Sequence, residues 1–211
     1  MAKFRAILQN RALVVRFKID QYTEDVPAML LECYKNEVAS RGVAFKEDQP
    51  TIDHINKAAK WLTGDYKPGL MISGIVGNGK TTLVRAIGRL IGLIYGPNQY
   101  NYEDRRTVKT VTALELADLA KQDPDAFRAI KNTKLLAIDD VGVEPALVKN
   151  WGNEISPFVE TIYHRYDRQL FTIMTSNLNP EDLEKRYGVR IADRFTEMFD
   201  RIAFENSTYR K

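Results

Sequence analysis

The feature that most constrains the fold is the segment GIVGNGKT at residues 74–81, which matches the pattern G-x-x-x-x-G-K-[ST] in full. It follows an apolar run at residues 70–73 and precedes a helical pattern with apolar side chains at positions 83, 84, 87 and 90. Glycines there let backbone N–H groups turn inward, and the positive end of the helix faces an anion. The segment therefore predicts a phosphate-binding loop between a strand and a helix; the alternative is a glycine-rich turn without a ligand.

The same pattern predicts a role for each polar residue of the loop. We expect Lys80 to reach the β- and γ-phosphates of a nucleotide, the Thr81 hydroxyl to bind Mg²⁺, and Thr82 to lie near the α-phosphate. The residues expected to contact the nucleotide are Gly74, Val76, Gly77, Asn78, Gly79, Lys80, Thr81 and Thr82.

A second apolar run, at residues 135–138, ends in two adjacent acids, Asp139 and Asp140. Two carboxylates at the end of a buried strand repel each other, and a bound cation would offset this repulsion, so the pair predicts a cation site. We expect Asp139 to hold Mg²⁺ through water, and Asp140 to take a proton from, or to orient, an attacking water. Glu144 is a second candidate for the latter role. The alternative for both aspartates is an Asx-type turn before Gly142.

A further strand pattern, at residues 171–175, leads into Asn177. Parallel strands present a ligand site at their carboxyl ends, so we expect Asn177 to hydrogen-bond the γ-phosphate or the attacking water. The alternative is an asparagine turn before the Asn179-Pro180 pair.

Three arginines, Arg186, Arg190 and Arg194, recur every four residues, but Gly188 separates the first from the others. Arg190 and Arg194 are expected to share a helix. Because residues 181–211 hold seven basic and seven acidic side chains, a solvated face with salt bridges is the alternative to a functional role.

The remaining pattern alternates strands with helices and predicts an α/β fold with a parallel sheet of five strands. The expected strands are residues 70–73, 108–111, 135–138, 171–175 and 202–204, and Thr112 with Glu115 forms an expected capping box. A helix is expected over residues 154–168. Two helices, over residues 27–41 and from position 50 or 51 to 63, precede the sheet. We therefore expect a basic arm and helical segment at residues 1–64 and a P-loop core at residues 65–211.

The first 19 residues contain five basic and no acidic side chains. Together with Phe4 and Phe17, such an arm could bind single-stranded nucleic acid, because cations release phosphate counterions and aromatic rings stack on bases. The alternative is a solvated or strand-forming terminus.

Composition excludes several other classes of protein. With 44% hydrophobic and 28% charged residues, the chain is too apolar for a disordered protein. Its apolar runs fall short of the roughly 20 residues that a membrane span needs, and we expect a cytoplasmic protein without a membrane partner. One cysteine, Cys33, and two histidines exclude a multi-cysteine zinc site, so any metal should be bound by oxygen.

The ordered set GIVGNGKTT, LLAIDDVG, TIMTSN and RIADRF resembles the AAA+ ATPases of the DnaC and IstB type, which are helicase loaders and transposition ATP-binding proteins. The resemblance spans residues 69–204. It implies ATP and Mg²⁺ as ligands, with residues 74–82 as Walker A, Asp139 and Asp140 as Walker B, and Asn177 as sensor 1. It further implies that Arg194 is an arginine finger that reaches the nucleotide of a neighbouring subunit. The family's sheet order would place the first strand between the fifth and the fourth, with the third and second beyond.

The likeness implies an ATPase that is slow unless assembled and that acts in DNA replication or transposition. Its expected partners are further copies of the chain, single-stranded DNA, and a replicative helicase or a transposase. The sequence departs from the family pattern in three ways: Asp140 is shorter than the usual Glu, no large C-terminal lid follows the core, and residues 1–64 lack a zinc-binding domain. Two alternatives therefore stay open, a small-molecule phosphotransferase and a module that binds ATP with little hydrolysis.

Overall fold

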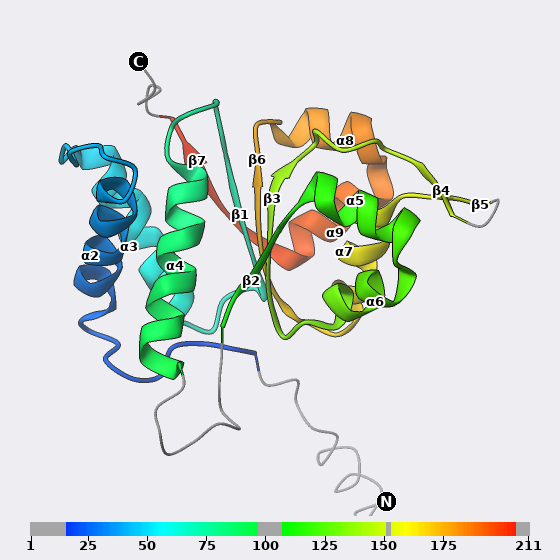
Figure 1. Cartoon of the computed structure of the whole chain (residues 1–211). Helices are drawn as coiled ribbons and strands as arrows, with labels where there is room; N and C mark the ends of the chain where they lie inside the picture. The colour runs from blue at the N-terminus through cyan, green and yellow to red at the C-terminus, as the bar shows by residue number, and fades with distance from the viewer. Residues whose placement is uncertain (1–15, 97–106, 151–152, 206–211) are drawn as a thin grey trace, which may run out of the picture.

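The computed structural model describes residues 16–96, 107–150 and 153–205 (Figure 1). Its helices are α2 (Val26–Ala39), α3 (Gln49–Thr63), α4 (Lys80–Tyr95), α5 (Ala113–Gln122), α6 (Pro124–Asn132), α7 (Pro157–Asp167), α8 (Pro180–Tyr187) and α9 (Val189–Met198). Its strands are β1 (Gly69–Gly74), β2 (Lys109–Thr112), β3 (Leu135–Val141), β4 (Val148–Asn150), β5 (Asn153–Ile155), β6 (Phe171–Ser176) and β7 (Phe199–Phe204).

Five strands form one parallel sheet in the order β2-β3-β6-β1-β7. The first strand, β1, lies between β6 and β7, with Gly69 opposite both Thr172 and Phe199. The parallel five-stranded α/β fold is thus confirmed, and so is the strand order that the family resemblance implied.

Helices cover both faces of the sheet: α2, α3 and α4 pack on one face, and α5, α6, α7 and α9 on the other (Figure 1). The alternation of side chains along β1 explains this arrangement, because Leu70 and Ile72 belong to the first hydrophobic cluster and Met71 to the second. A parallel sheet buried on both faces needs such continuous apolar strands.

The helices that precede the sheet belong to the same core as the P-loop helix. Side chains of α2 and α3, including Leu30 and Leu62, share a hydrophobic cluster with Leu83 and Ile87 of α4. Helix α3 begins at Gln49, and the carboxylate of Asp48 accepts a hydrogen bond from the Thr51 N–H at 2.8 Å. The division of the chain after residue 64 stays a prediction.

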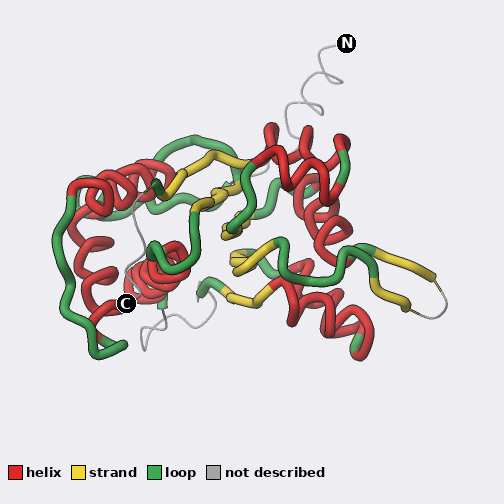
Figure 2. The backbone as a smooth tube through the Cα atoms, turned by 90° about the horizontal axis from the view of Figure 1, so that it is seen from above, coloured by secondary structure: helices red, strands yellow, loops and turns green. Residues whose placement is uncertain are grey.

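The expected helix over residues 154–168 is wrong in its first turn. Residues 148–150 and 153–155 pair as the antiparallel hairpin β4-β5, outside the main sheet, and the helix begins only at Pro157. Proline favours the first turn of a helix, while residues before it favour extended backbone, which explains the later start. Figure 2 shows the hairpin projecting from the body of the protein.

The bounds of all five strands differ from the prediction, those of β1 and β6 by no more than one residue at an end. Strand β3 continues through both aspartates to Val141, β7 begins at Phe199 instead of residue 202, and β2 is displaced by one residue. Hydrogen bonding to neighbouring strands, which no local pattern encodes, extends β3 and β7.

The described part of the basic arm is engaged within the chain. Phe17 packs edge-on against Tyr95 and Phe171, with ring centroids 5.7 and 5.2 Å apart. Arg16 donates hydrogen bonds to Tyr66 O and Gln169 Oε1, both at 2.9 Å. Phe17 thus has packing partners within the chain, and its expected contact with nucleic acid stays a prediction. The other expected aromatic residue of the arm, Phe4, lies outside the described residues, and within those residues no helix has the length and apolar character of a membrane span.

Candidate nucleotide-binding site

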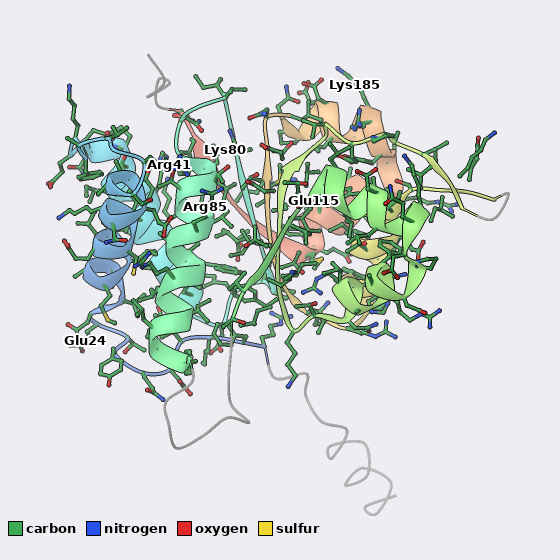
Figure 3. All side chains as sticks on the ribbon, viewed as in Figure 1. Glu24, Arg41, Lys80, Arg85, Glu115 and Lys185 are labelled. Carbon is green, nitrogen blue, oxygen red and sulfur yellow. The ribbon has the colours of Figure 1, made fainter. Side chains whose placement is uncertain are left out.

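The predicted site residues meet at the carboxyl ends of three neighbouring strands. The glycine-rich loop follows β1, Asn177 follows β6, and Asp139 and Asp140 lie near the end of β3. Figure 3 shows Lys80 at the N-terminal end of α4, beside β1. The order of the strands therefore brings together residues that are far apart in the sequence.

Lys80 lies at the centre of this group. Its side chain is buried, and Nζ lies 2.7 Å from Gly74 O, 2.7 Å from Ile75 O and 2.8 Å from Asn177 Oδ1. Asn78 Oδ1 is a further neighbour at 3.3 Å. The ammonium group is thus held beside the Asn177 side chain, where an anion could replace the neutral acceptors and form stronger, charge-assisted hydrogen bonds.

Two glycines of the loop are required by close contacts. Gly74 has φ +148° and Gly79 has φ +101°, both in the region that glycine tolerates best. A Cβ on Gly74 would lie 2.4 Å from Phe204 O, and a Cβ on Gly79 would lie 2.4 Å from the Tyr34 hydroxyl. The loop therefore fits tightly between β7 and α2, which fixes the direction of its backbone N–H groups.

Asn78 links the loop to β7. Its side chain is fully buried, and Nδ2 donates to Phe204 O at 3.0 Å while Oδ1 faces Lys80. The sequence predicted Asn78 only as a nucleotide contact, because the position of the last strand is a tertiary property.

Thr81 and Asp139 lie together, as their predicted common role in metal binding requires. The Thr81 hydroxyl donates to Asp139 Oδ1 at 3.2 Å, and the Thr175 hydroxyl donates to the same oxygen. Hydroxyl and carboxylate oxygens suit Mg²⁺, which keeps several waters and commonly takes its remaining ligands from substrate phosphates. Within the described ranges no group of three or more His, Cys, Asp or Glu residues has the geometry of a metal site. The oxygens of Thr81 and Asp139 would therefore suit Mg²⁺.

Asp140 occupies an unusual backbone position for a strand residue. Its φ is +56°, and the pairing of β3 with β6 shifts register between Ile138 and Val141. The Asp140 N–H donates to Thr175 Oγ1 at 2.9 Å. Thr175 thus binds both aspartates, a contact that the sequence analysis missed. Backbone strain of this kind costs about 1–3 kcal/mol and is common at functional sites, which supports a functional role for Asp140.

Glu144 has a structural environment. Its side chain is buried and accepts hydrogen bonds from the Gly142 N–H at 2.8 Å and from the Tyr187 hydroxyl. Burial raises the pKa of Tyr187, and the hydrogen bond to Glu144 adds to this effect. Arg186 donates to Glu144 O. Both carboxylate oxygens of Glu144 thus accept hydrogen bonds within the chain. Glu144 is therefore poorly placed to take a proton from an attacking water, the role for which it was the second candidate.

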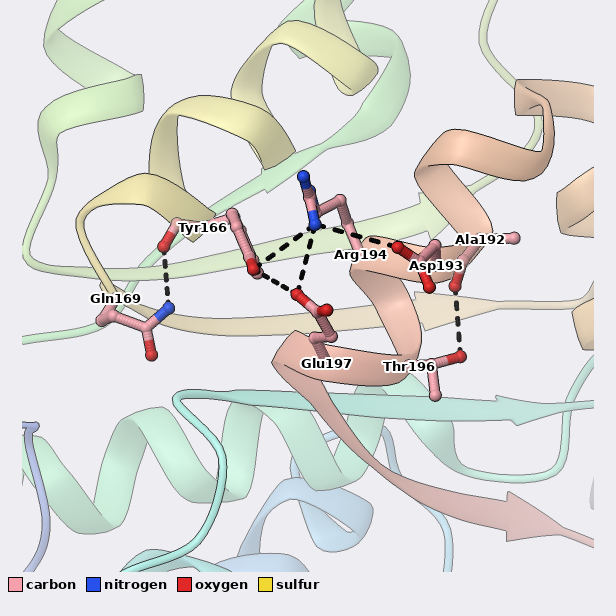
Figure 4. A network of polar contacts seen from close by, with 7 residues as sticks. All are labelled: Tyr166, Gln169, Ala192, Asp193, Arg194, Thr196 and Glu197. Carbon is pink, nitrogen blue, oxygen red and sulfur yellow. Dashed lines mark hydrogen bonds and ion pairs between the residues drawn. The ribbon is translucent and has the colours of Figure 1, made fainter.

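The structure does not bring Arg194 to the nucleotide loop of its own chain. As expected, Arg190 and Arg194 share α9, whereas Arg186 lies on α8. The residue after α9, Phe199, pairs with Gly69 at the start of β1, while the loop follows Gly74 at the other end. Figure 4 shows Arg194 among Tyr166, Asp193 and Glu197. Arg194 therefore lies apart from the group formed by Lys80 and Asn177.

Solved structures share this fold. The crystal structure of the DnaC helicase loader matches with a TM-score of 0.58 and 20% identity, over 76% of this chain and 93% of that chain. The crystal structure of DnaI matches with a TM-score of 0.59 and 22% identity, over 79% of this chain and 88% of that chain. A replication initiator DnaA bound to AMPPCP and single-stranded DNA matches with a TM-score of 0.53 and 20% identity, over 78% of this chain and 48% of that chain. The chain thus spans about half the length of that DnaA. No family model and no curated protein matches the sequence.

Proposed function

The chain has the fold of the DnaC-type AAA+ proteins, and from this premise we propose that it is an Mg²⁺-dependent ATPase that acts as a nucleotide-controlled switch in DNA replication. The observation that carries the proposal is the meeting of Lys80 with Asn177, and of Thr81 with Asp139, at the end of the sheet where the phosphate loop begins.

In this proposal each residue of the site has a distinct task. The loop from Gly74 to Thr82 binds the phosphates of ATP, and Lys80 neutralises the β- and γ-phosphates. Thr81 and Asp139 hold Mg²⁺, which neutralises charge on the phosphate oxygens when it is bound. Asn177 orients the γ-phosphate or the water beside it, and the Asp140 carboxylate accepts a proton from that water.

Arg194 acts on the nucleotide of a neighbouring copy. An arginine that stabilises the transition state of phosphoryl transfer raises the rate by about 10³–10⁵. A single copy, whose Arg194 lies among residues of α7 and α9, should hydrolyse ATP slowly. Assembly then controls turnover, and the nucleotide state controls assembly.

The structural neighbours support the proposed partners. One neighbour is the DnaC helicase loader, and another is a DnaA bound to AMPPCP and single-stranded DNA. We propose self-association, contact with single-stranded DNA, and a replicative helicase as partner. A role in transposition, with a transposase as partner, remains the alternative within the same resemblance.

A second candidate function is a module that binds ATP with little hydrolysis. The observation that favours it is the side chain of Asp140, whose carboxylate stands one methylene closer to the backbone than that of a Glu. Radiolabelled ATP turnover, measured with and without single-stranded DNA, separates this case from the main proposal. The variant Asp140→Glu should raise the turnover if reach limits the reaction.

The main proposal is tested by two measurements. Calorimetric titration with Mg-ATP should give a binding signal for the natural protein and none for Lys80→Ala. Specific ATPase activity should rise with protein concentration, and Arg194→Ala should lower it at least about 1,000-fold. Arg128→Ala is the matched control, because Arg128 is an exposed helical arginine whose ion pair with Asp125 is exposed as well. Activity that is independent of concentration and insensitive to Arg194→Ala would contradict the proposal.

The DNA contact has its own test. If cationic side chains neutralise phosphates, the logarithm of the binding constant for an oligonucleotide should fall with the logarithm of salt concentration, with a slope of about 0.7 per neutralised phosphate. A binding constant that does not change with salt would remove DNA from the proposed function.

A further inference from the structure

The side chain of Arg194 is restrained by neighbours on two helices. Its guanidinium lies over the Tyr166 ring, with Cζ 4.6 Å from the centroid, and Nη1 lies 3.3 Å from Glu197 Oε2. The Tyr166 hydroxyl donates to the same carboxylate oxygen and lies 3.5 Å from Arg194 Nη1 (Figure 4). Each of the three side chains therefore contacts the other two: the Arg194 guanidinium, the Tyr166 ring with its hydroxyl, and the Glu197 carboxylate.

We infer that Tyr166 and Glu197 are positioning residues, which hold the Arg194 guanidinium in the orientation that it needs before a second copy of the chain binds. This inference rests on the proposed function for the role of Arg194. The restraint itself belongs to the isolated chain and is testable there.

The backbone of Tyr166, whose ring lies under the Arg194 guanidinium, is itself held by hydrogen bonds. Gln169 donates to Tyr166 O through Nε2 at 2.8 Å and through its backbone N–H at 3.0 Å. These bonds follow the last turn of α7, and Gln169 Oε1 in turn accepts from Arg16. The Tyr166 backbone is therefore held by a segment that is itself anchored, so the ring offers a fixed surface for the guanidinium.

The restrained guanidinium stays accessible. The Arg194 side chain is 35% exposed, and it lines a shallow hollow together with Tyr163, Arg190 and Asp193. Asp193 Oδ2 lies 3.8 Å from Arg194 Nη1. An incoming anion can thus approach the face of α9, while Tyr166 and Glu197 keep the arginine from adopting other rotamers.

The restraint matters because an arginine side chain has many rotamers. Its rotamer freedom is equivalent to about 30-fold in an equilibrium constant. When packing selects one orientation in the isolated chain, that cost does not recur as the interface forms, which is the general advantage of a preorganised site. Loss of the Tyr166 ring should therefore weaken the action of Arg194 without changing the phosphate loop.

The first test measures the motion of Arg194 by NMR in the isolated protein. The order parameter of its Nε–H bond should be about 0.8 in the natural protein and below about 0.6 in Tyr166→Leu. Tyr166→Phe, which keeps the ring and removes the bond to Glu197, should lie between them. Tyr163→Phe is the matched control, because Tyr163 is on the same helix and its hydroxyl has no hydrogen-bond partner among the described residues. An order parameter below 0.6 in the natural protein, or one unchanged in Tyr166→Leu, would overturn the inference.

The second test separates positioning from stability. Under saturating ATP and protein, Tyr166→Leu should lower kcat about 10-fold, while its affinity for an ATP analogue in the monomer stays within twofold of the natural value. Unfolding of Tyr166→Leu should be checked first, and Tyr166→Phe, expected to lower kcat about threefold, serves if the leucine variant does not fold. If Arg194→Ala has no effect on kcat, the proposed function fails in its arginine-finger step, whereas the NMR result still decides the restraint. If Arg194→Ala lowers kcat and both Tyr166 variants do not, the inference alone is overturned.

Discussion

Replacement of the buried Arg165 by methionine should destabilise the protein by about 3 kcal/mol. Arg165 is fully buried on α7, and its guanidinium donates to Thr172 Oγ1 at 2.8 Å, Phe171 O at 2.6 Å, Thr133 O at 2.7 Å and Lys131 O at 3.0 Å. Burial lowers the pKa of Arg165 to about 9, so the group stays charged at neutral pH. It thereby joins the end of α6, helix α7 and the start of β6.

The magnitude follows from the acceptors that the methionine would leave behind. The carbonyl oxygens of Phe171, Lys131 and Thr133 each lose a hydrogen bond from the guanidinium, and the last two lie at the C-terminus of α6. A hydrogen bond to a charged group contributes about 1.5–3 kcal/mol. Phe171 stays paired with β3, Thr172 keeps the hydrogen bond from its hydroxyl to Leu170 O, and methionine relieves the desolvation of a buried charge. The net loss is therefore about 3 kcal/mol, below the sum of the three contributions.

Equilibrium unfolding in urea, followed by far-ultraviolet circular dichroism, measures this loss as a lower midpoint with an unchanged slope. The matched control is Arg168→Met, three residues further along. Arg168 is exposed and its hydrogen bond to His164 O is long, at 3.4 Å, so the change should stay within about 0.5 kcal/mol. If Arg165→Met unfolds at the same midpoint as the control, the hydrogen bonds of Arg165 do not carry the stability assigned to them.

Three further predictions follow from the structure. Gly79→Ala should abolish Mg-ATP binding in calorimetry and destabilise the fold by at least about 1 kcal/mol, because its Cβ would meet the Tyr34 hydroxyl at 2.4 Å from a φ of +101°; binding of natural strength would refute this. Tyr187→Phe should cost about 1.5–3 kcal/mol in urea unfolding, because the buried Glu144 carboxylate loses a donor; an unchanged midpoint would contradict it. Burial lowers the pKa of His54 below its ordinary 6.5, so the contribution of His54 to the free energy of unfolding should be constant above pH 7 and fall as the pH drops through 6.5, since the unfolded chain binds the proton more strongly. That fall should shrink in His54→Asn, and an equal fall in both proteins would assign it to other groups.

Much of the site could be predicted because it follows two local rules. A phosphate loop is contiguous, so residues 74–81 carry their own geometry, and polar residues at strand ends converge whenever the strands are parallel. The bond between Lys80 and Asn177, which are 97 positions apart, is the result of that convergence. The role of Thr175 beneath the aspartates was missed, because a threonine inside an apolar strand has no distinguishing local signal.

The differences between the predictions and the structure have a common physical origin. The hairpin β4-β5 forms by pairing between two segments, and periodicity within residues 154–168 cannot report a partner strand. Glu144 was a candidate base because it is close in sequence to Asp140, yet α8 folds back and supplies Tyr187 to its carboxylate. Phe17 was expected as a base-stacking residue, and the sequence could not show that its ring packs against Tyr95 and Phe171.

The amino-acid sequence by itself determined the α/β class, the phosphate-loop pattern and the identity of the polar residues at the strand ends, because these depend on residues that are close together along the chain. Only the tertiary structure decided where Arg194 lies and which residues restrain it. It also decided which acceptors bind the Arg165 guanidinium and which backbone conformation Asp140 adopts. Those features depend on contacts between elements that are distant in sequence, and the free energy of such contacts exists only once the sheet and its two layers of helices have packed.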